Sequence, residues 1–337
     1  MLRLEGHEAA IQSFESAFRD DRLHHAYLIT GPAHVGKLLL ATQLAQALNC
    51  VRPGDEPCGR CQACTRIAAG THADVRVIRV NPEATEGPKT AIGIGTVREL
   101  IASAHLRPYE GRTRVFIFDG ADMMTNDAAN ALLKVLEEPP PDVHLLLLAA
   151  SEDSVLDTIR SRCQHVELHP LPIPQVIQIL QADHGMNADR ADIVARLSRG
   201  CLGWAIEAAR DPALLAGVHQ SLERIAEVAE EGLENRFGYA EQLARRFQRD
   251  RDAGREELFL WLRWLRDVLL VQHHQVGSIV NVSWRETIQR HAGALTPADT
   301  VRWLHLVTES IEALERNANP RLALDLMMLE APTIRLS

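Results

Sequence analysis

The sequence predicts an α/β fold in the first half of the chain and an all-helical second half, and three observations support this prediction. A short apolar segment, residues 26–30, runs directly into a glycine-rich loop, and a helical pattern follows the loop. Two further apolar segments, residues 114–119 and 143–150, alternate with helical patterns, which is typical of a mostly parallel sheet. From residue 211 onward the apolar spacing is helical.

The size and composition of the chain predict more than one domain and no membrane-spanning helix. A length of 337 residues corresponds to two or three domains, and 46% hydrophobic content can fill a sizeable core. The net charge of -9 argues against a protein that grips nucleic acid over its whole surface, although a local basic patch is compatible with it. Apolar runs are shorter than the roughly 18 residues of a membrane helix, and residues 1–7 lack a signal-peptide core. We therefore expect a cytoplasmic protein without membrane contact.

The loop at residues 31–37 has the pattern of a phosphate-binding loop. In the motif G-x-x-x-x-G-K-[ST], Gly31 and Gly36 let backbone N–H groups surround phosphate oxygens, and Lys37 supplies positive charge. The last position, which normally carries a hydroxyl for Mg²⁺, is Leu38. We therefore expect the architecture of the loop without its metal anchor.

Four of the six cysteines, Cys50, Cys58, Cys61 and Cys64, lie close together in a segment that follows the helix after the loop. In a reducing compartment this spacing favours a metal site over disulfides. Four thiolates suit tetrahedral Zn²⁺ and leave no coordination position for water, so we predict a structural and not a catalytic ion. Unmetallated thiols are the alternative; a redox C-x-x-C function lacks the flanking strand and helix that it requires.

The remaining elements of the α/β half follow from local patterns. Residues 74–80 alternate like a strand, whereas residues 6–18, 94–105 and 125–136 carry apolar side chains at helical spacing. The last of these helices begins at a capping threonine and ends before three prolines.

The strand pattern at residues 114–119 ends in Asp119, the position at which an aspartate faces Mg²⁺ in ATPases of this general type. The next residue is Gly120, where such ATPases place a glutamate that activates water. Asp119 joins Gly31, Gly36 and Lys37 as a candidate nucleotide site of degenerate form, and the sequence leaves open whether it binds ATP. A simpler interpretation, in which Asp119 is only a turn residue, also stays open.

The second half of the chain divides into two helical parts. Residues 170–210 contain three short helical patterns after a proline-containing linker and are interpreted as a small lid. Residues 211–337 are interpreted as an all-helical domain, in which the helix around Trp261 is apolar nearly all round and must be buried on several sides. Four arginines at residues 245–251 are interpreted as a solvated helix face, since aspartates lie among them; contact with DNA is the alternative.

Together these motifs resemble bacterial clamp-loader subunits of the AAA+ superfamily, along essentially the whole chain. The resemblance implies an AAA+ nucleotide-binding-like domain at 1–169 with a zinc module at 50–64, a helical lid at 170–210, and a collar at 211–337 that joins subunits into a ring. It rests on the phosphate-binding loop, the four cysteines, the run N-A-L-L-K-V-L-E-E-P-P at residues 130–140, Ser161-Arg162-Cys163, and the closing run at residues 317–324.

Departures from the active pattern of this family place the chain with the members that do not hydrolyse ATP. Leu38 and Gly120 lack the required side-chain groups, and the polar sensor expected at the end of the third strand falls on Ala149 or Ala150. The lid segment at residues 200–205 contains no arginine. This set leaves no obvious residue to stabilise charge in phosphoryl transfer.

The resemblance also suggests a role in trans. In this family the arginine of the Ser-Arg-Cys motif reaches the nucleotide site of a neighbouring subunit, so Arg162 is the candidate arginine finger, a planar and always charged donor matched to phosphate oxygens. A local salt bridge is the alternative interpretation of Arg162.

The leading hypothesis is therefore an interaction protein, which presents Arg162 to an adjacent ATPase while the complex loads a sliding clamp onto primed DNA during replication. The implied partners are the gamma/tau and delta subunits, the sliding clamp and, through the complex, primed DNA; polymerase activity lies in another subunit of the holoenzyme. One alternative is a gamma/tau-like clamp-loader ATPase with unusual site residues. Another is a zinc-dependent DNA-binding module, motivated by the four cysteines.

Overall fold

The computed structural model describes residues 4–20, 22–52, 57–81 and 90–334, so parts of the predicted zinc module (53–56) and of the N-terminal segment (1–3) lie outside the described residues. The chain forms two compact units. The first combines Met1–Gln175 with Gly200–Trp204, and the second combines Val176–Arg199 with Ala205–Ser337. The predicted division at 169/170 and 210/211 stays a prediction.

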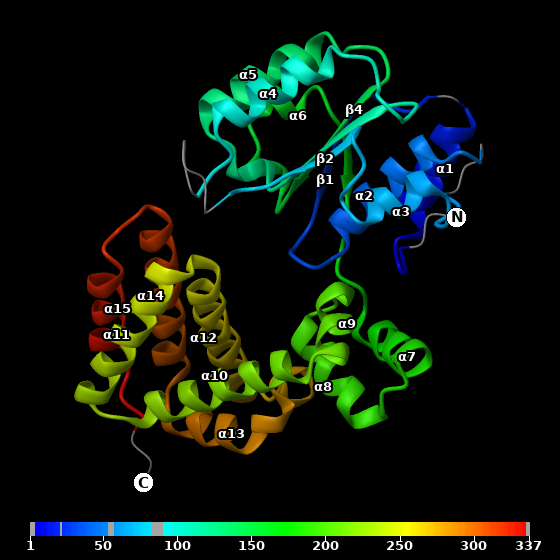
Figure 1. Cartoon of the computed structure of the whole chain (residues 1–337). Coiled ribbons are helices and arrows are strands. Elements are labelled where there is room, and N and C mark those ends of the chain that lie inside the picture. Colours follow the sequence, from blue (N-terminus) through cyan, green and yellow to red (C-terminus); the bar gives the residue numbers. More distant parts are fainter. Residues whose placement is uncertain (1–3, 21, 53–56, 82–89, 335–337) are drawn as a thin grey trace. The chain divides into compact units, whose positions relative to one another are not determined.

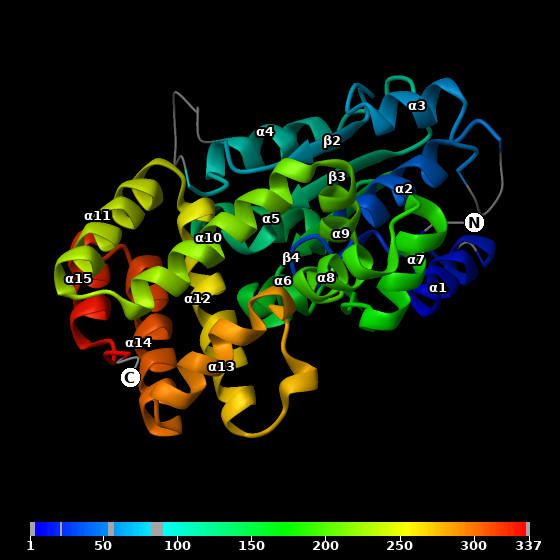
Figure 2. The same ribbon diagram turned by 90° about the horizontal axis from the view of Figure 1, so that it is seen from below.

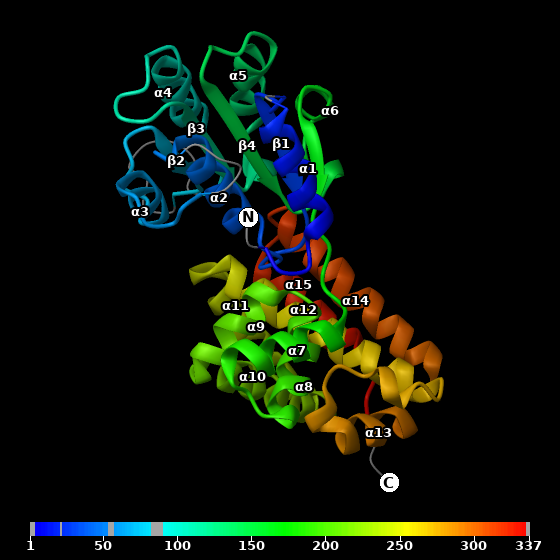
Figure 3. The same cartoon turned by 90° about the vertical axis from the view of Figure 1, so that its right-hand side faces the viewer.

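The first unit is built on a five-stranded parallel sheet in the order β2-β3-β4-β1-β5 (Figure 3). The parallel sheet predicted from the alternation of strands and helices is thus confirmed. Because all strands run the same way, the segments that leave their carboxyl ends meet at one edge of the sheet. The strands are β1 (Ala26–Thr30), β2 (Val75–Ile78), β3 (Arg114–Asp119), β4 (Val143–Ala149) and β5 (Gln164–Glu167).

Helices cover both faces of this sheet (Figure 1), so its central strands are buried on both sides and read as continuous apolar runs. Leu28 packs into the core on one face and its neighbour Ile29 into the core on the other, as the two-residue period of a strand requires. One face carries α1 (Glu8–Arg19), α2 (Lys37–Asn49) and α3 (Gln62–Ala68); the other carries α4 (Ile94–Ala104), α5 (Asn126–Glu137) and α6 (Asp157–Arg160). Short 3-10 turns, η1 (Ala121–Met123) and η2 (Glu152–Ser154), follow β3 and β4.

The second unit is helical throughout its described residues, and α12 (Arg251–Gln272) packs against four other helices. Trp261 and Trp264 of α12 are fully buried, which confirms the prediction of a helix enclosed on several sides. Figures 1 and 2 show α11 and α15 side by side. The helices that follow β5 are α7 (Ile173–His184), α8 (Ala188–Ser198), α9 (Leu202–Arg210), α10 (Pro212–Glu230), α11 (Leu233–Arg249), α12, α13 (Arg285–Ala294), α14 (Pro297–Glu315) and α15 (Pro320–Glu330), with 3-10 turns η3 (Val276–Ser278) and η4 (Val282–Trp284).

Two of the four arginines at residues 245–251 contact buried or backbone groups of the second unit. Arg246 pairs with the buried carboxylate of Glu257, and Arg251 donates to the carbonyl of Leu314 at 2.9 Å. These contacts support a structural function of the cluster. Among the described residues, no helix is long and apolar enough to cross a membrane.

Candidate functional site

The phosphate-binding loop lies where the sequence predicts it, between β1 and α2. Gly31 has φ +143° and Gly36 has φ +117°, and a Cβ atom on Gly31 would lie 2.3 Å from the carbonyl oxygen of Leu168. Both positions favour glycine, because L side chains rarely adopt this backbone conformation, and at Gly31 the neighbouring backbone also leaves no room for a Cβ atom. Helix α2 begins directly at Lys37.

Lys37 is turned back onto its own loop. Its ammonium group donates to the carbonyl oxygens of Gly31 and of Pro32, the latter at 2.8 Å. Burial lowers the pKa of Lys37, and the nearby carboxylates of Asp122 and Asp119 act in the opposite direction. Lys37 and Asp119 are thus brought to the same edge of the sheet, as the sequence predicts for a nucleotide site.

Asp119 has a partner that the sequence analysis missed. The guanidinium of Arg79 donates from Nε to Oδ2 of Asp119 at 2.8 Å, and both side chains are partly exposed. Arg79 directly follows β2, which neighbours β3, and this position at the carboxyl edge of the sheet is the signal that could have identified it.

The positions after β3 and β4 carry no side chain suited to catalysis. Gly120 has φ +104°, and a Cβ atom there would lie 3.3 Å from the sulfur of Met123, so a glutamate at this position would be strained. At the end of β4, Ala149 is buried, and the backbone N–H of Ala150 donates to the carboxylate of Asp122 at 3.3 Å. The two places that supply a water-activating acid and a polar sensor in active sites are therefore filled by glycine and alanine.

The segment at residues 200–205, which the sequence predicts to belong to a lid, contacts the phosphate-binding loop through backbone atoms of Gly203. The N–H of Gly203 donates to the carbonyl oxygen of His34 at 3.0 Å, and a Cβ atom on Gly203 would lie 2.6 Å from the same oxygen. His34 has a positive φ of +60°. The backbone at Gly203 thus lies directly against the backbone at His34. Residues 200–205 contain no arginine.

The residues around the phosphate-binding loop lack ligands for the Mg²⁺ ion of Mg·ATP. Leu38 offers no oxygen ligand, and the carboxylate of Asp119 is already engaged by Arg79. A hard divalent cation requires oxygen ligands, so the site does not fit a bound Mg²⁺.

The four cysteines fit a tetrahedral metal ion. Their Sγ atoms all lie within 4.8 Å of one another, and those of Cys50 and Cys61 are 4.0 Å apart. A tetrahedral zinc with Zn–S bonds of about 2.3 Å separates its sulfurs by about 3.8 Å, so little rearrangement is needed. Backbone N–H groups of Arg60 and Cys61 lower the pKa of Cys58 to about 6, which favours its thiolate.

The cluster joins several elements of the first unit. Cys50 ends α2, and the side chain of Cys61 caps α3 by accepting from the N–H of Cys64. Arg112 donates to the carbonyl of Cys50 at 2.8 Å. Burial raises the pKa of Cys64 to about 12, so its thiolate form requires a cation beside it.

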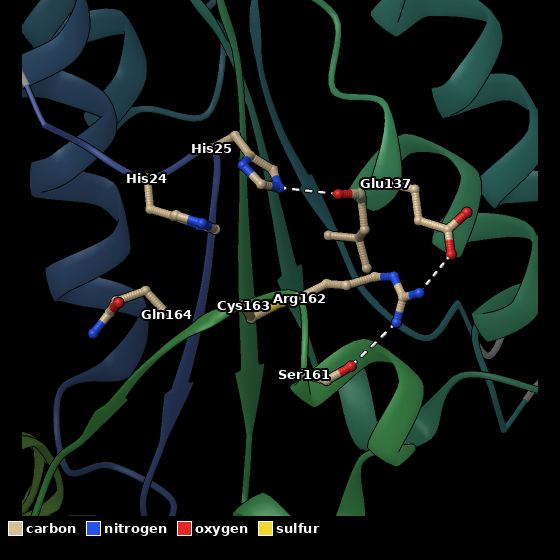
Figure 4. A pocket seen from close by; sticks show the side chains of 8 residues that line it. His24, His25, Glu137, Ser161, Arg162, Cys163 and Gln164 are labelled. Carbon is tan, nitrogen blue, oxygen red and sulfur yellow. Dashed lines mark hydrogen bonds and ion pairs between the residues drawn. The ribbon is translucent and has the colours of Figure 1, made fainter.

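Arg162 lies in a surface pocket of about 700 Å³ (Figure 4). Its guanidinium donates to Glu137 at 2.7 Å, to the carbonyl of Thr158 at 2.9 Å and to the hydroxyl of Ser161 at 3.1 Å. The local salt bridge considered from the sequence is therefore present, while 36% of the Arg162 side chain stays exposed. The pocket is lined by His24, His25, Leu136, Glu137, Ser161, Arg162, Cys163 and Gln164.

The pocket and the phosphate-binding loop lie at opposite edges of the same sheet. His25 precedes β1 and Gln164 begins β5, whereas the loop leaves the carboxyl end of β1. The five residues of β1 span about 16 Å at the usual rise per residue. Arg162 thus lies at the opposite edge of the sheet from the phosphate-binding loop of its own chain.

Comparison with known proteins gives the family. Residues 6–172 match the family described as DNA polymerase III, delta subunit. The chain is 29% identical to the DNA polymerase III subunit delta prime of Bacillus subtilis over 304 residues, which cover 90% of this chain and 89% of that protein. The chain belongs to the delta prime family of DNA polymerase III clamp-loader subunits.

The chain is also similar to further subunits of DNA polymerase III and to a solved structure. The delta prime subunit of Pseudomonas aeruginosa is 43% identical over 149 residues, which are 44% of each chain. The gamma/tau subunit of Mycobacterium tuberculosis is 36% identical over 178 residues, or 52% of this chain and 30% of that protein. A solved gamma subunit-related protein from Thermotoga maritima covers 97% of this chain and 100% of its own, with 20% identity and a TM-score of 0.44.

Proposed function

We propose that this delta prime-like clamp-loader subunit does not hydrolyse ATP itself and supplies Arg162 in trans to the nucleotide site of a neighbouring ATPase subunit. One observation carries the proposal: Arg162 lies partly exposed in a pocket at the opposite edge of the sheet from its own phosphate-binding loop. Its planar guanidinium is always charged and suits the oxygens of a phosphate group. A neighbouring subunit is thus the natural source of the phosphate.

The state of the chain's own site supports the absence of hydrolysis. Leu38 replaces the metal-binding hydroxyl, Gly120 replaces the water-activating glutamate, and Arg79 occupies the carboxylate of Asp119. Phosphoryl transfer depends on positioned water and on cations that neutralise developing charge. Of these two requirements, Lys37 supplies only a positive charge and does not position a water molecule.

The proposed partners are the gamma/tau and delta subunits, the sliding clamp and, through the complex, primed DNA. The delta prime relatives are named as subunits of DNA polymerase III, which supports assembly with the other subunits of that enzyme. Assembly through the proposed collar is supported by α15, on which three leucines of one helix face are exposed. These are Leu322, Leu326 and Leu329.

The four-cysteine cluster is proposed to hold a structural Zn²⁺. Cys50, Cys58, Cys61 and Cys64 form no disulfide bonds, which supports a reducing, cytoplasmic location. The zinc would fix the segment between α2 and α3 and leave no position for a reacting water.

The deciding experiment measures steady-state ATP turnover of the reconstituted complex with Arg162→Ala. Removal of an arginine finger lowers turnover at the site that it serves by about 10³-fold or more, so the complex should lose the share of turnover contributed by that site. The matched control is Arg160→Ala, because Arg160 lies two residues away and pairs with acids of its own segment. Unchanged turnover with Arg162→Ala would contradict the proposal.

A gamma/tau-like ATPase is the second candidate, favoured by 36% identity to gamma/tau subunits over half of the chain. It predicts that the isolated chain turns over ATP and that Lys37→Ala abolishes this activity. The absence of turnover by the isolated wild-type chain would dismiss it.

A further inference from the structure

The ion pair between Arg79 and Asp119 is built into the sheet. Strands β2 and β3 pair in parallel with Ile78 opposite Phe118, so the next residues along each strand are Arg79 and Asp119. Their side chains leave neighbouring strands at the same edge, and Nε of Arg79 lies 2.8 Å from Oδ2 of Asp119. The contact therefore follows from the register of two strands and does not depend on a flexible loop.

Asp119 is the residue that an active site of this architecture directs at a divalent cation. The other side chain needed for that cation, a hydroxyl at position 38, is replaced by the apolar side chain of Leu38, which packs against the core. Lys37 does not contact Asp119 directly but donates to carbonyl oxygens of the loop. The cation that contacts this carboxylate is Arg79.

We propose that Arg79 is a resident cation that takes the place of Mg²⁺ at Asp119 and excludes a divalent metal from this phosphate-binding loop. An arginine cannot lose its proton at physiological pH, so the positive charge beside Asp119 is permanent. A guanidinium donates hydrogen bonds but offers no coordination sphere in which phosphate oxygens and water can be arranged. A nucleotide that enters this loop is therefore bound without metal. The inference does not depend on the role of Arg162.

The test is a fluorescence titration of the full chain with MANT-ATP, in EDTA and in excess Mg²⁺. In the wild type the two affinities should be equal within about a factor of 1.5, because Arg79 already pairs with the carboxylate of Asp119. Arg79→Ala should make binding about two- to fivefold tighter with Mg²⁺ than with EDTA, a modest effect because the ion pair is partly exposed. Adding Asp119→Asn should return the ratio to one.

Two further variants make the result specific. Arg76→Ala removes another exposed arginine of β2 and should behave as the wild type. Leu38→Thr restores a hydroxyl. The affinity of this variant for MANT-ATP should not depend on Mg²⁺ while Arg79 is present. When Arg79→Ala is added, the affinity should depend on Mg²⁺. Circular dichroism confirms that each variant is folded.

Three outcomes would overturn the proposal. The first is wild-type binding that is already tighter with Mg²⁺ and loses this effect with Asp119→Asn. The second is the lack of a Mg²⁺ effect with Arg79→Ala in both the native and the Leu38→Thr backgrounds, whether or not nucleotide binds. The third is a Mg²⁺ effect with Arg76→Ala equal to that with Arg79→Ala.

Discussion

At the scale of single residues, buried charges hold the loops that flank the sheet. The carboxylate of Asp74 is fully buried and accepts hydrogen bonds from the backbone N–H groups of Tyr109, Glu110 and Gly111, each at 2.8 Å. Burial raises the pKa of Asp74, but these donors and the nearby Arg114 outweigh it, so that the net shift is downward. One side chain thus fixes the loop that precedes β3.

We expect Asp74→Ala to lower the free energy of unfolding of the first unit by about 2–4 kcal/mol, because three backbone N–H donors lose their buried acceptor. Since the folded pKa is depressed, the stabilisation is fully present above the unfolded pKa of about 3.9 and is lost as pH falls through the lower folded value. Urea unfolding of both proteins at neutral and acid pH measures this. The difference between them should shrink below about pH 4; a constant difference would contradict the assignment.

At the residue scale, the sequence locates candidate residues that share one local motif, but it does not reveal a partner that comes from a distant strand. Gly31, Gly36 and Lys37 lie in one loop, so spacing alone located them. Arg79 is forty residues from Asp119 in the chain, and only the register of β2 on β3 brings them together. Without the sheet order, an arginine after a strand carries no signal.

At the scale of elements, the four-cysteine cluster brings together the end of α2, the segment that follows it and α3. The described part of this segment is short, and Cys50 and Cys64 are its buried anchors. Metal-bound segments of this kind draw their folding energy from the ion.

We expect about one Zn²⁺ per purified chain and a loss of this ion with Cys61→Ser, because three thiolates bind zinc more weakly than four. The segment should then become sensitive to limited proteolysis near residues 50–64. Cys163→Ala is the control, since Cys163 lies outside the cluster. Elemental analysis measures the zinc. Loss of duplex DNA binding by Cys61→Ser with intact assembly would instead favour the DNA-binding module.

Element-scale prediction was strongest for strands buried on both faces. Residues 26–30, 114–119 and 143–150 are apolar because helices cover both sides of the sheet, and the structure confirms these strands to within a residue. Strand β5 was missed, because Gln164–Glu167 contains one aliphatic residue and lies at the sheet edge with partial exposure. Its formation depends on pairing with β1, which no local pattern encodes.

At the scale of the whole molecule, the exposed leucines of α15 are the feature that folding of a single chain does not explain. Leu322, Leu326 and Leu329 are 69%, 53% and 54% exposed and share one helix face. Exposed apolar stripes of this kind mark association surfaces.

Leu326→Glu should therefore weaken assembly with partner subunits by about tenfold or more, because a charge would be buried in the contact. Size-exclusion chromatography with light scattering measures assembly. The control is Leu106→Glu, a change at an equally exposed leucine in the first unit. Assembly that is insensitive to Leu326→Glu would place the contact elsewhere.

Under the proposed role of Arg162 in trans, its ion pair with Glu137 would affect how such an assembly responds to nucleotide. The free subunit already satisfies its guanidinium with an acid of its own, so docking beside a triphosphate exchanges one anion for another. The free energy gained by exchanging Glu137 for a phosphate group would be small, and there would be no gain when the neighbour's site is empty. A ring governed by this competition would tighten and loosen with nucleotide occupancy instead of locking permanently.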